Sequence, residues 1–214
     1  MSGTNCFVLI VNGNLSHAEF PGAKNLACSY QFVYGSDWEV VRVTGEGANM
    51  ETGLTQLSER GAGTRAIYLW NFPLEITFRS TNPYGWPKLC VNVCEGNAKT
   101  TIKGYGWCHV PVNPGRHSNT IRLFKPRNSS IIQGILSSIT GKTPEFINPT
   151  SICEGEGREV TRVQSEGTVR VVFDVMIKDM TKFGFEPVNT KHHQSILHED
   201  EDVPDEIETS KRLN

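Results

Sequence analysis

The segment 80–87, Ser-Thr-Asn-Pro-Tyr-Gly-Trp-Pro, constrains the fold of this chain more than any other stretch. It separates two alternating runs, 74–79 and 89–93, whose apolar residues lie two apart and predict half-buried strands. Pro83 and Pro87 fix φ and lack backbone donors, so neither strand can continue through them. Gly85 permits a turn, and the rings of Tyr84 and Trp86 can cover the end of a sheet. Because the loop carries no nucleophile, general base or metal ligand, it favours recognition or assembly over chemistry.

Short alternating runs recur along the whole chain, separated by Gly, Pro and Asn turn signals. Leu26, Cys28, Tyr30 and Phe32, for example, alternate with Ala27, Ser29, Gln31 and Val33, which would face the other side of a sheet. Many short strands with this punctuation predict an all-β fold, an antiparallel β-sandwich. The expected strands are 7–11, 26–34, 38–43, 66–70, 74–79, 88–94, 101–112, 120–124, 159–163 and 168–178.

One stretch breaks the pattern of strands. Between 129 and 139 four isoleucines and Leu136 fall at helical spacing, behind an N-cap candidate at Asn128 or Ser129. We predict one short helix insertion at 129–139. A strand is the alternative, since isoleucine favours strands.

The charge distribution divides the chain into a domain, 1–188, and an acidic tail, 189–214. Residues 190–214 carry a net charge of −4, whereas the rest of the chain carries +2, against a total of −2. The tail has no period and few large apolar residues, so we expect it to be disordered. A total charge this small argues against a nucleic-acid footprint, and we expect no nucleic-acid partner.

The cysteines and the N-terminal residues are typical of a cytosolic protein. The chain has six cysteines, and no two of them are separated by the two residues of a zinc motif, so we expect free thiols. The first apolar run, 6–11, is too short for a signal peptide or a membrane span.

Five segments, in this order, carry a family resemblance. They resemble the B-nine domain family of ciliary transition-zone proteins over most of 5–185, and the likeness weakens between 43 and 65 and ends after about 188. The resemblance implies a C-two-like, lipid-binding-type β-sandwich. The segments are Trp70-Asn71-Phe72-Pro73, the 80–87 loop, Gly104-Tyr105-Gly106, Pro114-Gly115-Arg116-His117 and Gly155-Glu156-Gly157-Arg158-Glu159-Val160-Thr161-Arg162.

The same resemblance implies a function. It predicts a noncatalytic subunit of the tectonic-like (Meckel syndrome) complex, which forms the diffusion barrier between plasma and ciliary membranes and supports ciliogenesis and hedgehog signalling. The implied partners are sister B-nine domain proteins and transmembrane tectonic-type subunits. The implied location is the cytoplasm and cytoskeleton at the basal body and transition zone. The alternative is a calcium-independent membrane-lipid-binding module at the ciliary base, making peripheral membrane contact through the mildly basic domain.

The residue patterns and the family resemblance together give the candidate site residues. We expect no catalytic, cofactor or metal site, because calcium needs converging carboxylates and the domain has only Asp37, Asp174 and Asp179. Gly141-Lys142-Thr143 lacks the upstream glycine of a phosphate-binding loop. Charged residues at strand edges can select a partner by complementarity, or they can simply be solvated. Aromatic residues can anchor an interface, or they can cover the core or the edge of a sheet. The partner-interface candidates are Tyr84, Trp86, Arg116, Arg158, Glu159 and Arg162.

Overall fold

The computed structural model describes residues 6–41, 51–96, 101–126 and 163–185. Within them the chain forms β-strands and one 3-10 helix, and the paired strands run antiparallel, which confirms the predicted all-β antiparallel fold. The elements are β1 (Phe7–Glu19), β2 (Asn25–Val33), β3 (Trp38–Val40), β4 (Thr52–Leu54), β5 (Ser58–Glu59), β6 (Ile67–Ser80), β7 (Lys88–Glu95), β8 (Thr101–His109), β9 (Gly115–Pro126), β10 (Val163–Lys178) and η1 (Met180–Phe183).

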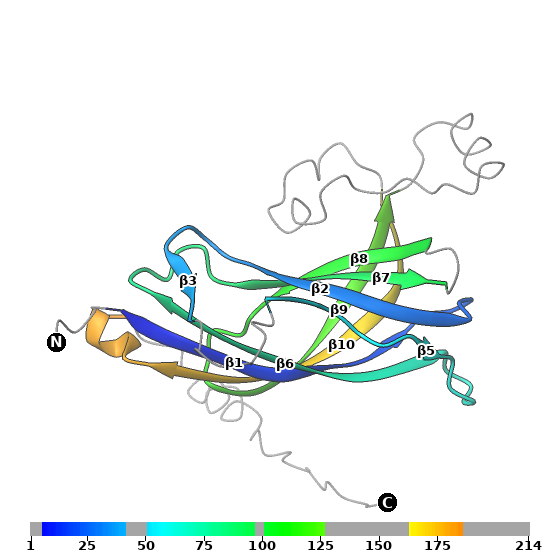
Figure 1. Cartoon of the computed structure of the whole chain (residues 1–214), viewed down its shortest axis with the longest axis horizontal. Coiled ribbons are helices and arrows are strands. Elements are labelled where there is room, and N and C mark those ends of the chain that lie inside the picture. Colours follow the sequence, from blue (N-terminus) through cyan, green and yellow to red (C-terminus); the bar gives the residue numbers. More distant parts are fainter. Residues whose placement is uncertain (1–5, 42–50, 97–100, 127–162, 186–214) are drawn as a thin grey trace, which may run out of the picture.

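The two layers of the sandwich belong to one continuous sheet. Its strand order is β3-β6-β1-β10-β9-β8-β7-β2-β4, and β5 pairs with β2. The sheet curls, so that β6, β1 and β10 form one layer and β8, β7 and β2 lie opposite them (Figure 1). Curling in this way lets one sheet bury its inner face against itself.

The core fills the space between the two layers. The predicted period of two is visible in the burial of β2, where Leu26, Cys28, Tyr30 and Phe32 are buried and Gln31 is exposed. Across the core the ring centroids of Phe32 and of Phe78 on β6 lie 5.9 Å apart, and the rings meet edge to face. Each such side chain contributes about 1.5–3 kcal/mol through the removal of apolar surface from water. This contact therefore helps to hold the two layers together.

A β-bulge accounts for one wrong prediction, the separate strands at 66–70 and 74–79. They form a single strand, β6, because the register against β1 shifts between the pairs Leu15↔Phe72 and His17↔Leu69. The extra residue is accommodated at Asn71, whose φ of 48° is positive and whose side chain accepts a hydrogen bond from Asn14. A bulge of this kind lets a strand continue past an irregular position.

Other strand boundaries differ from the prediction at their ends. The strand expected at 38–43 is β3, which ends at Val40, and the strand expected at 101–112 is β8, which ends at His109. The strand expected at 7–11 continues to Glu19 as β1. The predicted helix at 129–139, residues 159–162 of the predicted strand 159–163, and the tail 189–214 lie outside the described residues.

Free thiols are found at four cysteines: Cys6, Cys28, Cys94 and Cys108. Burial raises the pKa of the Cys28 thiol, and the neighbouring Cys94 adds to the effect, so this thiol stays protonated and unreactive at neutral pH. The expectation of a free thiol is wrong for Cys90, which is disulfide-bonded. Among the residues described, no helix has the length and apolar character needed to cross a bilayer.

Candidate partner-binding surface

The loop between β6 and β7, residues 81–87, is fastened to the turn that precedes β3. The indole Nε1 of Trp38 donates a hydrogen bond to the carbonyl oxygen of Tyr84 at 2.8 Å. The backbone N–H of Gly35 donates to the carbonyl oxygen of Gly85 at 2.9 Å. Two consecutive carbonyl groups of the loop are thus held by a segment almost fifty positions earlier in the sequence. The loop is therefore fixed at its tip as well as at its ends.

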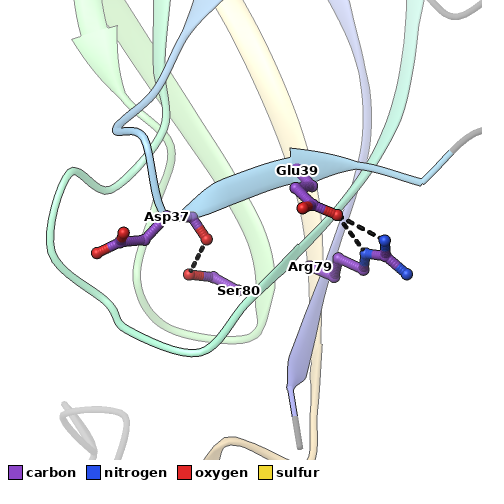
Figure 2. Close-up of polar contacts among 4 residues, drawn as sticks. All are labelled: Asp37, Glu39, Arg79 and Ser80. Carbon is purple, nitrogen blue, oxygen red and sulfur yellow. Dashed lines mark hydrogen bonds and ion pairs between the residues drawn. The ribbon is translucent and has the colours of Figure 1, made fainter. Parts of the chain in front are cut away.

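Polar side chains hold the first half of the same loop. The hydroxyl of Ser80 donates to the carbonyl oxygen of Asp37 at 2.8 Å, a contact that Figure 2 shows beside the tip of β3. Asn82 accepts a hydrogen bond on Oδ1 from the backbone N–H of Tyr84 at 3.0 Å, the pattern of an Asx turn. Its Nδ2 donates to Asp37 Oδ2 at 3.2 Å. These bonds preset the backbone conformation from which the Tyr84 side chain projects.

Gly85 is required by the close approach of the two segments. Its φ is 72°, in the left-handed region that favours glycine. A Cβ atom at this position would lie 2.6 Å from the Cα of Gly35, closer than real Cβ contacts come. A side chain at Gly85 would therefore push the loop away from the turn before β3.

Trp86 covers the end of the sheet. Its indole Nε1 donates to the carbonyl oxygen of Val110 at 2.8 Å. Its ring meets that of Trp38 edge to face, with the centroids 5.1 Å apart. The side chain is partly buried and packs against the core. Of the two roles considered for this residue, these contacts support a structural one.

Tyr84 is 82% exposed, the largest exposed fraction among the exposed large hydrophobic residues of the described chain. Its backbone is held on both sides, by the Asx turn at its N–H and by Trp38 at its carbonyl oxygen. An aromatic side chain on a rigid backbone loses little conformational entropy on binding, a feature of residues that anchor interfaces. Tyr84 therefore remains the leading interface candidate.

A hollow of about 410 Å³ lies next to this loop. Its lining includes Lys88, His109 and the partly buried Trp86. Burial and then the neighbouring Lys88 lower the pKa of His109, so its imidazole is neutral at pH 7. The Lys88 ammonium lies 5.3 Å from the centre of the Trp107 ring, a cation–π distance. The lining residues are Val33, Tyr34, Gly35, Gly85, Trp86, Lys88 and His109.

The remaining interface candidates lie elsewhere. Arg116 is on β9, where its side chain is 75% exposed and its Nε lies 3.9 Å from Asp174 Oδ1 on β10. It does not line the hollow beside Tyr84. Arg158, Glu159 and Arg162 lie outside the described residues. Tyr84 and Trp86 thus share one loop but differ in burial, and Arg116 lies on β9, outside the lining of the hollow.

No cluster of three potential metal ligands occurs among the residues described. Asp37, Asp174 and Asp179, the only aspartates of the predicted domain, each contact a side chain that is not a carboxylate. Asp37 accepts from Asn82, Asp174 faces Arg116, and Asp179 pairs with Lys182 at 2.5 Å beside η1. In that pair the hydrogen bond from Lys182 lowers the pKa of Asp179.

Comparison with known proteins identifies the family. The B9-C2 family model, described as ciliary basal body-associated B9 protein, matches residues 9–176. The chain belongs to this B9 family. B9 domain-containing protein 1 of Xenopus laevis is 44% identical over 186 residues, which cover 86% of this chain and 91% of the relative. The human protein of that name is 42% identical over 182 residues, covering 84% and 86%.

More distant similarity extends to a second B9 group. B9 domain-containing protein 2 of Homo sapiens shares 24% identity over 178 residues, which cover 82% of this chain and 97% of the relative. Among solved structures, a C2 domain of plant Extended Synaptotagmin 1 is similar at a TM-score of 0.39 and 12% identity. That match covers 78% of this chain and 92% of the domain. The family match and the B9 relatives confirm the resemblance found in the sequence motifs at the level of the B9 family.

Proposed function

We propose that this chain is a noncatalytic subunit of the tectonic-like complex at the ciliary transition zone. In this role it helps to form the barrier between plasma and ciliary membranes, and ciliogenesis and hedgehog signalling depend on it. The observation that carries the proposal is the match of residues 9–176 to a ciliary basal body-associated family. The high coverage of the vertebrate B9 domain-containing protein 1 sequences supports it, because nearly the whole relative is represented.

The 81–87 loop supports a role in binding other proteins. An exposed aromatic ring on a backbone that is hydrogen-bonded on both sides suits a preorganised anchor. The hollow beside it offers apolar and aromatic walls with a lysine at its edge. The proposed partners are sister B9 domain proteins and the transmembrane tectonic-type subunits of the complex.

The rival function, calcium-independent binding to anionic lipid, needs a concentrated basic patch. In the part of the chain that the structure describes, five cationic side chains lie within ion-pair distance of a carboxylate. Their paired charges reduce the local positive potential that would attract a membrane. This favours protein partners, while peripheral membrane contact remains the alternative to test.

The experiment is affinity capture of the tagged full chain from ciliated cells, followed by mass spectrometry and fluorescence imaging. The expected result is enrichment of sister B9 proteins and transmembrane tectonic-type subunits, with the tagged chain concentrated at the ciliary base. A parallel flotation assay uses vesicles containing phosphatidylserine, with and without calcium. Flotation of the chain alone, without capture of those proteins, would replace the assembly proposal with the lipid-binding one.

A further inference from the structure

The outer surface of the β6, β1 and β10 layer carries an ordered pattern of charge. Along β1, Phe7, Leu9 and Val11 are buried in the core, so Val8 and Ile10 lie on the opposite, outer side of the sheet. The same alternation holds on β10, where Val171, Phe173 and Val175 are buried. We call the outward side chains of these three strands the outer face.

Strand register arranges the outer face in rows that run across the three strands. In each row a β1 residue lies between its partners on β6 and β10. The first row is Arg79–Val8–Lys178, the second is Thr77–Ile10–Met176, and the third is Glu75–Asn12–Asp174. The first row therefore carries two cations, the second none, and the third two carboxylates.

The middle row is the apolar centre of this pattern. Met176 is 52% exposed near the C-terminal end of β10, and Ile10 beside it is half-buried. An apolar centre with charged residues around it is the usual organisation of a protein interface. Methionine is well suited to such a centre because its flexible thioether adapts to an opposing surface.

Neighbouring strands hold some of the charges in place. Glu39 on β3 receives two hydrogen bonds from Arg79, at 2.8 Å from Nε and 2.5 Å from Nη2 (Figure 2). Asp174 lies 3.9 Å from Arg116 on β9, at the limit of an ion pair. Lys178 is exposed at the end of β10. Arg79 and Asp174 thus stay on the outer face, where each shares its charge between its own neighbour and an opposing surface.

We propose that the outer face binds a second copy of this chain across a two-fold axis that runs along the middle row. With this axis each strand lies opposite the same strand of the second copy, and the two strands run in opposite directions. Each first row then faces the third row of the partner. Lys178 meets the partner's Asp174, Arg79 meets the partner's Glu75, and Met176 meets the same residue of the partner. The pattern of charge is therefore complementary to itself, as a two-fold interface requires.

The size of the face sets the strength expected of this contact. Three strands with their flanking edges span about 20 Å, and the five residues of a strand from the first row to the third span about 17 Å. The footprint is on the order of 350 Å² per copy, below the ~800 Å² per partner of a standard stable interface. The proposal is therefore a weak dimer that forms at high local concentration, such as within a larger assembly.

The first test is sedimentation equilibrium of the full chain from about 1 µM to about 1 mM at low salt. The wild type should dimerise, and added salt should weaken the dimer because its charge pairs are screened. Lys178→Glu should raise the dissociation constant about tenfold or more, since the two-fold axis repeats each change. The double variant Lys178→Asp with Asp174→Lys should restore dimerisation, because the opposite charges face each other again. Arg65→Glu, an equal change of charge on an exposed loop, is the matched control.

A second test addresses the geometry. Packed sheets lie about 10 Å apart, too far for a disulfide but within reach of a short bis-maleimide. Met176→Cys should therefore give a cross-linked dimer with this reagent, because the residue faces itself across the axis. Glu75→Cys, which faces Arg79 of the partner, should give much less, and the wild type measures the reaction of the native thiols. A wild type that stays monomeric at about 1 mM would overturn the proposal, even if the face binds another protein. Failure of the charge swap to restore the dimer would do the same.

Discussion

The close approach of Gly85 to Gly35 gives a prediction with a matched control inside the same chain. Gly85 and Gly22 have similar positive φ angles, 72° and 79°. A Cβ at Gly85 would lie 2.6 Å from the Cα of Gly35, whereas a Cβ at Gly22 would meet nothing within 4 Å. Alanine at either position should lower the free energy of unfolding by about 1 kcal/mol, because it must adopt the left-handed conformation. Only Gly85→Ala must also displace the loop from the turn before β3.

The additional cost at Gly85 can be estimated from the contacts that would be lost. Displacement removes the hydrogen bond from Gly35 N–H to Gly85 and weakens that from Trp38 to Tyr84, each worth about 1 kcal/mol. We therefore expect about 3 kcal/mol for Gly85→Ala and about 1 kcal/mol for Gly22→Ala. The difference corresponds to a melting temperature lower by about 4–8 °C in a protein of this size.

The assay is urea unfolding of both variants, with thermal unfolding as a second probe. Equal losses of stability, within about 0.5 kcal/mol, would show that the loop does not depend on this approach. A loss of stability about 2 kcal/mol larger in Gly85→Ala than in Gly22→Ala would confirm that the turn before β3 holds the loop.

Three further predictions concern other parts of the structure. Trp86→Phe keeps most of the ring but leaves the buried carbonyl of Val110 without its donor, so urea unfolding should show a loss of about 1–2 kcal/mol. The hydrogen bond from Lys103, at 2.6 Å, lowers the pKa of Glu95, so its stabilising effect is complete above about pH 4.5 and is lost as the pH falls through the lower folded value. Glu95→Gln should therefore be less stable at pH 7 and show a shallower stability change between pH 5 and pH 3; an unchanged profile would contradict this. Millimolar calcium should not raise the melting temperature, whereas bound calcium at a hundred times its dissociation constant would add about 2.7 kcal/mol and be removed by a chelator.

The sequence predicted the fold class well because the pleat of a strand imposes a period of two on burial. Leu26, Cys28, Tyr30 and Phe32 were expected on one side of a strand, and all four are buried. The limits of the strands were less predictable. Residues 66–70 and 74–79 form one strand only because a bulge at Asn71 absorbs the irregular residues between them, and the bulge depends on its pairing with β1.

The candidate site was predictable in part. The composition of the 80–87 segment indicated a rigid aromatic loop, but it did not distinguish the two rings. Burial does so, since Trp86 packs against the core and Tyr84 is exposed. The role of Trp38 was missed because its bond to the Tyr84 carbonyl joins residues 46 positions apart. The glycine of the Gly35-Ser36-Asp37 turn was the available signal, since two glycines can approach more closely than other residues.

The most direct test of the account is the affinity of the Tyr84→Ala variant for a purified sister B9 domain protein, such as B9 domain-containing protein 2. Tyr84 is exposed, so its loss should change the free energy of unfolding by no more than about 0.5 kcal/mol. As an interface anchor, its loss should cost about 2 kcal/mol of binding, a roughly 30-fold rise in the dissociation constant. Leu57→Ala, at another exposed apolar residue, should bind like the wild type. A Tyr84→Ala variant that is folded and binds with wild-type affinity would contradict the claim that this loop is the partner-binding surface.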